Sequence, residues 1–222
     1  IVIFRRDPAG GAAQLLMVER SANMNFAGGA TVFPGGKVDP ADRALAATLG
    51  GAFEDGAARV AAIRETLEET GLVIGIHGIV DAAIAAQARR MLLSGGELAP
   101  VLDQFGWTLA PERLVPFARW WPKHRIGRIF DTRFFLADLG TGAVEVEVDA
   151  TENRHLFWAS AASALELARQ AKIRIIFPTH RNLERLDQFD TFDAARDHAE
   201  AVPVGTISPY IEERDGEPWL MI

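Results

Sequence analysis

Cysteine is absent from this chain of 222 residues, which excludes disulfide bonds, a thiol nucleophile and cysteine-ligated zinc. A large excess of one charge is lacking too, because 30 acidic and 23 basic residues leave a net charge of -7. With 49% apolar residues and this modest charge, a mainly disordered chain is excluded. The acidic balance argues against nucleic acid as a partner, since nucleic-acid binders are usually basic.

Long hydrophobic runs are also lacking. The longest stretch without a charged residue spans 21–36, and it contains Pro34 and four glycines, so it does not suit a membrane span. No basic-then-apolar leader opens the sequence, so we expect no secretory signal. These features together lead us to expect a cytoplasmic protein without a membrane partner.

Short β-like runs alternate with helical patterns along the chain. The predicted strands are 1–4, 14–19, 30–33, 72–79, 134–138 and 144–148, with an extended tail at 206–211 and 218–222. The predicted helices are 57–70, 81–93, 97–105, 159–171 and 191–201. This order indicates one mixed α/β domain of the α+β type over residues 1–222, with a helical insertion at about 81–113. The apolar residues of the insertion would suit a homodimer, or they could simply cover the sheet.

The most informative segment reads Arg-Glu-Thr-Leu-Glu-Glu-Thr-Gly-Leu at 64–72. On a helix, the stripe that would be buried consists of Val60, Ile63 and Leu67, and three carboxylates lie opposite it, those of Glu65, Glu68 and Glu69. These carboxylates repel one another, and the last two face the unfavourable end of the helix dipole. A hard divalent cation would offset the repulsion. The ordinary alternative is a solvated acidic face.

This segment, with Phe33-Pro34-Gly35-Gly36-Lys37 upstream of it, resembles the box of the Nudix hydrolase family. The matching positions are Gly36, Arg64, Glu65, Glu68, Glu69, Gly71 and Leu72, while Thr66 stands where a bulkier apolar residue is usual. The resemblance implies a mixed β-sheet sandwiched between helices and a Mg²⁺ or Mn²⁺ cofactor. It implies that the metal ligands are Glu65, Glu68, Glu69 and the Gly36 carbonyl oxygen, with Arg64 orienting a glutamate.

The spacing of the box departs from the family pattern. Between Gly36 and Arg64 lie 27 residues, about twice the usual number, and Gly56 occupies the place of the first glutamate of the box. Candidates for the missing carboxylate are Asp42, Glu54 and Asp55. The lengthened box, the helical insertion and the tract at 128–137 resemble a subgroup that includes acyl-coenzyme A diphosphatases.

The resemblance implies hydrolysis of a diphosphate bond in a nucleoside diphosphate derivative, with coenzyme A or an acyl-coenzyme A as the preferred substrate. Hydrolysis of ADP-ribose or a nucleotide sugar is the alternative within enzymes. A non-catalytic nucleotide-binding Nudix module is the alternative outside them, since the first glutamate is displaced. The resemblance makes Glu152 a candidate general base, because it precedes Trp158 at a position where Nudix proteins often carry a glutamate. The equal alternative is a solvated loop acid.

A basic segment at 113–133 holds six basic residues and a single acid, Asp131. Arginine pairs with phosphate in a bidentate manner, so this segment would suit a substrate with several phosphates. The substrate-binding candidates are Arg20, Arg125, Arg128 and Arg133, with Trp120 to stack on adenine. In the plainer alternative, Trp120 and its neighbour Trp121 pack in the interior and the arginines lie on a wet surface.

Overall fold

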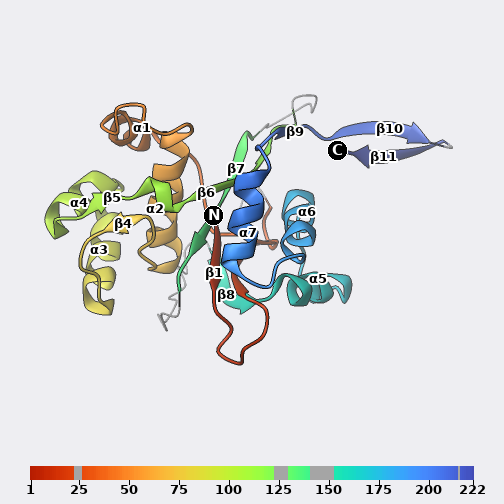
Figure 1. Cartoon of the computed structure of the whole chain (residues 1–222), viewed down its shortest axis with the longest axis horizontal. Coiled ribbons are helices and arrows are strands. Elements are labelled where there is room, and N and C mark those ends of the chain that lie inside the picture. Colours follow the sequence, from red (N-terminus) through yellow and green to blue (C-terminus); the bar gives the residue numbers. More distant parts are fainter. Residues whose placement is uncertain (23–26, 123–129, 141–152, 215) are drawn as a thin grey trace.

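The computed structural model describes residues 1–22, 27–122, 130–140, 153–214 and 216–222, and a mixed β-sheet lies at its centre (Figure 1). The sheet order is β3-β2-β1-β7-β6-β9, with β8 beside β2. The strands are β1 (Val2–Arg5), β2 (Gln14–Arg20), β3 (Thr31–Val32), β6 (Val115–Trp120), β7 (Thr132–Asp138), β8 (Asn153–Ala159) and β9 (Thr206–Ile207). The β1–β7 and β6–β9 pairs are parallel, whereas the other pairs are antiparallel.

Helices cover both faces of this sheet (Figure 1). On one side lie α1 (Pro40–Ala47), α2 (Gly56–Thr70), α3 (Ala82–Gly95) and α4 (Leu98–Phe105); on the other lie α5 (Ala161–Arg169), α6 (Phe177–Leu186) and α7 (Phe192–Ala201). Because strand residues alternate between faces, Ile3 joins the core on the α2 side and Phe4 joins the core beneath α6 and α7. The predicted mixed sheet between helices is therefore confirmed.

The predicted helical insertion consists of α3 and α4 with a small sheet beside them. That sheet pairs β4 (Ile76–His77) with β5 (Thr108–Leu109), and the short 3-10 helix η1 (Pro111–Arg113) follows. The buried Arg59 of α2 donates hydrogen bonds to the carbonyl oxygens of Pro111 and Leu114, the first at 2.6 Å. The insertion is thereby fixed to α2.

Some boundaries differ from the prediction. The strand predicted at 72–79 is wrong over most of its length, because Gly75 and Gly78 adopt positive φ angles of 68° and 152° on either side of the short β4. The helix predicted at 159–171 begins at Ala161, since Ser160 caps its start by accepting a hydrogen bond from the Ser163 amide. The strand predicted at 144–148 lies outside the described residues.

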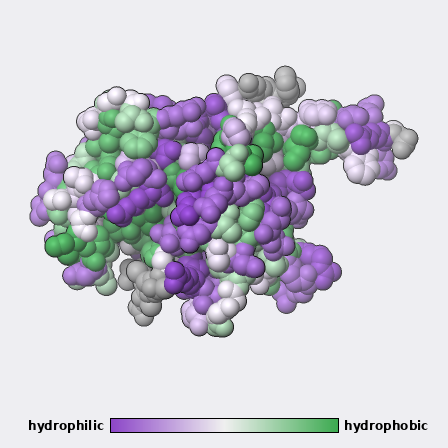
Figure 2. Space-filling view, viewed as in Figure 1, coloured by the Kyte–Doolittle hydropathy of each residue, from purple (hydrophilic) through white to green (hydrophobic). Residues whose placement is uncertain are grey.

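The predicted extended tail forms a hairpin of β10 (Tyr210–Arg214) and β11 (Glu217–Met221), which stands away from the rest of the molecule (Figures 1 and 2). Its large exposed side chains are Tyr210, Ile211, Trp219 and Leu220. Within the described residues, every helix is too short or too polar to cross a membrane.

Candidate metal centre

Helix α2 presents the glutamates, and its sequence explains where it begins and ends. Asp55 precedes it in the left-handed conformation (φ 60°), and Gly71 closes it at φ 74° by donating its amide to the Leu67 carbonyl oxygen at 3.0 Å. The predicted apolar stripe is confirmed, because Val60, Ile63 and Leu67 are each at most 2% exposed. This packing fixes the rotation of α2 and hence the direction in which its glutamates project.

The glutamates are not a solvated face. Glu69 is 3% exposed, and the side chain of Glu65 is 14% exposed, whereas that of Glu68 keeps 32% of its surface in solvent. The loop after β3 covers the two buried carboxylates. The Gly35 amide donates a hydrogen bond to Glu69 Oε2 at 2.9 Å, and Gly36 lies against Glu65.

Gly36 leaves room for the Glu65 carboxylate. A Cβ atom at Gly36 would lie 2.1 Å from Glu65 Oε1, closer than atoms can approach. The φ angle of Gly36 is not in the left-handed region, so the missing side chain, and not backbone freedom, is what this position requires. The sequence resemblance pairs these two residues, and the structure brings them into contact.

Arg64 holds two of the three glutamate side chains, those of Glu65 and Glu68. Its buried guanidinium donates to Glu65 Oε1 at 2.9 Å, to Glu68 Oε2 at 3.0 Å and to the Lys37 carbonyl oxygen at 2.9 Å. It also donates two hydrogen bonds to the Asp42 carboxylate, from Nε to Oδ1 at 2.9 Å and from Nη2 to Oδ2 at 3.1 Å. Each of these acceptors comes from the helix itself or from the lengthened segment before it.

Three residues are candidates for the missing first carboxylate of the box, and Asp42 is the candidate whose side chain contacts Arg64. Its side chain is 1% exposed, and it also accepts the Asp39 amide in the capping box of α1. Asp55 instead forms an ion pair with Arg133 at 2.5 Å, and Glu54 accepts a hydrogen bond from Arg59 through its backbone. The short helix α1, which the sequence patterns did not predict, therefore positions the partner of Arg64.

Burial and charge perturb the ionisation of this cluster. Burial raises the pKa of Glu65 to about 7; the Arg64 charge opposes this effect, and the charges of Glu69 and Glu68 add to it. For Arg64, burial alone would lower the pKa, but the hydrogen bonds and charges of Asp42 and Glu65 outweigh it and raise the pKa above its usual value. The negative charges of Glu68 and Glu69 thus disfavour ionisation of Glu65, and the positive charge of Arg64 favours it.

The donor chemistry of this cluster fits a hard divalent cation. Among the described residues, no three acidic or histidine side chains already converge as a metal site; Arg64 donates hydrogen bonds to the carboxylates of Glu65 and Glu68. Magnesium, however, is usually held by one or two carboxylates together with waters and substrate oxygens. Three closely spaced carboxylates beside the Gly36 backbone supply oxygen ligands of this kind.

The predicted substrate-binding arginines and the predicted general base lie outside the glutamate helix. Arg20 ends β2 on the same face as Leu16, which packs on the α2 side, and its buried Nε has no hydrogen-bond partner among the residues that the structure describes. Arg133 is engaged by Asp55 and by Asp131, the latter at 3.2 Å. The predicted Arg125, Arg128 and Glu152 lie outside the described residues.

Trp120 occupies the core, as in the plainer interpretation. It is 3% exposed, makes an edge contact with Phe177 and donates its indole N–H to Asn182 at 3.4 Å. A ring enclosed in this way has no open face on which an adenine could stack. The predicted stacking role is therefore dropped for Trp120.

One contact to the glutamates comes from a residue that no sequence motif singled out. Arg89 of α3 is 7% exposed and donates hydrogen bonds to the backbone carbonyl oxygens of Glu68 and Glu69, at 3.0 and 3.3 Å. A lone arginine in an amphipathic helix gives no signal of such a role, because the contact depends on how α3 packs against α2.

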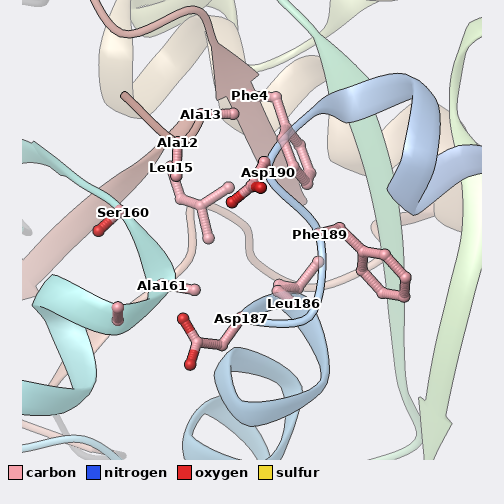
Figure 3. Close-up of a pocket in the computed structure, with 11 residues that line it drawn as sticks. Phe4, Ala12, Ala13, Leu15, Ser160, Ala161, Leu186, Asp187, Phe189 and Asp190 are labelled. Carbon is pink, nitrogen blue, oxygen red and sulfur yellow. The ribbon is translucent and has the colours of Figure 1, made fainter. Parts of the chain in front are cut away.

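Two hollows of the described surface lie away from the glutamates. A cavity of about 110 Å³ is lined by Phe4, Leu15 and Ala161, with Asp187 and Asp190 around it (Figure 3). A neighbouring hollow of about 300 Å³ is lined by Gln14, Trp158 and other residues near the β1–β2 turn. No glutamate of α2 lines either one, so burial, charge and hydrogen bonding define the candidate site here, not concavity.

The chain is similar to known proteins in sequence and in fold. The NUDIX domain family matches residues 1–92, a match that stops within α3. A NUDIX hydrolase from Alicyclobacillus acidocaldarius is similar at 26% identity and a TM-score of 0.76, over 88% of this chain and 92% of that one.

Two more distant structures are a C. elegans Ap4A hydrolase binary complex, and the NUDIX domain of Shewanella oneidensis NrtR complexed with ADP ribose. The first is 18% identical with a TM-score of 0.45, over 84% of this chain and 91% of that one. The second is 14% identical with a TM-score of 0.40, over 84% and 82%. The Alicyclobacillus structure and the similarity of residues 1–92 to the NUDIX domain family show a mixed α+β Nudix fold, and they support a pyrophosphohydrolase enzyme.

Proposed function

We propose that the protein uses Mg²⁺ or Mn²⁺ to hydrolyse a diphosphate bond in a nucleoside diphosphate derivative, and that coenzyme A or an acyl-coenzyme A is its preferred substrate. One observation above all supports the reaction. Glu65 and Glu69 are buried against Gly35 and Gly36, while Arg64, itself fixed by Asp42, holds Glu65 and Glu68.

The charge balance explains why a cation belongs here. Burying carboxylates without enough positive charge is costly, and the single guanidinium of Arg64 is shared between the carboxylates of Glu65 and Glu68. We propose Glu65, Glu68, Glu69 and the Gly36 carbonyl oxygen as the metal ligands. A bound divalent cation would neutralise the charge that builds on the diphosphate oxygens during hydrolysis.

The residues around the proposed metal ligands have distinct roles. Arg64 keeps the carboxylates of Glu65 and Glu68 in place, and Asp42 keeps Arg64 in place, the role that the first glutamate has in the family pattern. Gly36 leaves space for Glu65. We propose that Arg20, whose buried Nε–H has no hydrogen-bond partner in the described part of the chain, donates to a phosphate oxygen of the bound substrate.

The choice of coenzyme A follows from the resemblance to the acyl-coenzyme A diphosphatases. The presence of α1 in the lengthened box, and of α3 and α4 in the helical insertion, supports this proposal. We further propose that residues 1–222 form one domain, since the central sheet takes strands from β1 to β9. Glu152 remains our candidate for the general base.

Product formation from a small substrate panel tests this proposal. The panel holds coenzyme A, an acyl-coenzyme A, ADP-ribose, NADH and a nucleoside triphosphate, each with Mg²⁺, Mn²⁺ or chelator. We expect metal-dependent release of adenosine 3′,5′-bisphosphate from the coenzyme A compounds. Cleavage of ADP-ribose alone would overturn the substrate and keep the reaction. Binding of a nucleotide without any cleavage would favour the non-catalytic module.

A further inference from the structure

The last turn of α2 contains the glutamates and ends in carbonyl groups that the helix itself cannot satisfy. The final four carbonyl oxygens of any α-helix lack an intrahelical partner. In α2, the Leu67 carbonyl accepts the Gly71 amide, while the Leu72 amide bonds to the Thr70 hydroxyl instead of continuing the helix. The carbonyl oxygens of Glu68 and Glu69 therefore need donors from elsewhere.

Arg89 supplies those donors from the insertion. Its Nε donates to the Glu68 carbonyl oxygen at 3.0 Å, and its Nη2 donates to that of Glu69 at 3.3 Å. Its stem packs on the end of the helix, because a Cβ at Gly71 would lie 3.6 Å from Arg89 Cδ. Figure 1 shows α3, which contains Arg89, beside the end of α2.

The chemistry of arginine suits this position in two ways. Its planar fork can reach two neighbouring carbonyl oxygens at once, which a lysine ammonium on a single stem does less well. Its charge also lies at the negative end of the helix dipole, where Glu68 and Glu69 are unfavourable. Arg89 thus fixes the backbone from which both carboxylates project and offsets part of their repulsion.

We propose that Arg89 is a positioning residue for the metal centre: by fixing the backbone of Glu68 and Glu69, it presents their carboxylates in the arrangement that binds the cation. This inference rests on the proposed function, and it goes further because it makes the insertion part of the metal centre. Residues that orient metal ligands from outside typically contribute about 10- to 100-fold to metal affinity.

Titration of the purified protein with Mn²⁺, with Kd measured by calorimetry and by the electron paramagnetic resonance of free Mn²⁺, tests the proposal without reference to activity. We expect Arg89→Met to weaken Mn²⁺ binding by about 10-fold or more and Arg89→Lys to weaken it less. The matched control is Arg59→Met. Arg59 is likewise a buried arginine that donates to backbone carbonyl oxygens, but those oxygens belong to Glu54, Pro111 and Leu114. Both Met variants should lower Tm, and only Arg89→Met should lower Mn²⁺ affinity.

The possible results distinguish the role of Arg89 from the existence of the metal centre itself. If Arg89→Met lowers Tm as Arg59→Met does and binds Mn²⁺ within about twofold of wild type, Arg89 only stabilises the fold and the inference is overturned. If Arg89→Met fails to fold, Arg89→Lys and Arg89→Gln answer the same question, and unchanged affinity in both overturns it. If the wild-type protein binds no Mn²⁺, the metal centre itself is wrong and this inference falls with it.

Discussion

Replacing Asp42 with asparagine should destabilise the protein far more than the same change at Asp55. The Arg64–Asp42 pair is almost inaccessible, with side chains 4% and 1% exposed, and it is joined by two hydrogen bonds. Removing one member of a buried ion pair typically costs about 3–5 kcal/mol. Arg64 keeps its bonds to Glu65 and Glu68, and asparagine can still accept the Asp39 amide, so we expect about 3 kcal/mol.

The Asp55→Asn variant is the matched control. Asp55 pairs with Arg133, and both side chains keep about a quarter of their surface, so the loss should be at most about 1 kcal/mol. Asparagine also tolerates the left-handed conformation of residue 55. The free energy of unfolding is measured by urea titration in chelator at about pH 8, where the carboxylates are mostly ionised. Equal losses in the two variants, or a loss below about 1 kcal/mol for Asp42→Asn, would refute the assignment of Asp42 as the partner of Arg64.

Two further predictions concern the environment of Glu65. Its pKa is raised from 4.5 to about 7 in the metal-free protein, so the folded state retains a proton that the unfolded state has lost between those values. The free energy of unfolding in chelator should therefore fall as pH rises from about 4.5 to about 7, by up to about 3 kcal/mol, and stay lower above that range. Urea titrations across this range should show a shallower fall for Glu65→Gln, and identical slopes would contradict the raised pKa. Gly36→Ala should displace the Glu65 carboxylate and weaken Mn²⁺ binding by about 10-fold or more, whereas Gly95→Ala, at a site with open space around the added carbon, should leave Mn²⁺ binding unchanged. Equal Mn²⁺ affinities in these two glycine variants would show that the Gly36–Glu65 contact has no part in metal binding.

Local patterns predicted the glutamate helix well. The apolar spacing of Val60, Ile63 and Leu67 depends only on helical geometry, so the buried stripe followed from the sequence, and Gly71 ended the helix where expected. The solvent exposure of the glutamates on the opposite side of α2 depends on a distant segment, the loop that contains Gly36 and lies against Glu65. The sequence therefore left the metal site and the solvated face as alternatives, and the burial of Glu69 decided against the latter.

Non-local contacts account for what the sequence could not predict. The spacing of the box left three candidate partners for Arg64, which are Asp42, Glu54 and Asp55. The structure shows that Asp42, in the first turn of α1, contacts Arg64. Arg89 was missed because its role depends on the packing of α3. The strand predicted at 72–79 failed because an apolar run does not reveal the turns at Gly75 and Gly78.

The most direct test of the metal centre compares wild type with Glu68→Gln and Glu166→Gln on coenzyme A, in Mg²⁺, in Mn²⁺ and in chelator. Glu166 is a glutamate of α5, on the opposite side of the sheet, where it pairs with Arg169. We predict metal-dependent release of adenosine 3′,5′-bisphosphate by wild type and Glu166→Gln, and its loss in Glu68→Gln and in chelator. Cleavage that persists in Glu68→Gln at the wild-type rate, or in chelator, would contradict a metal-dependent reaction at the glutamates of α2.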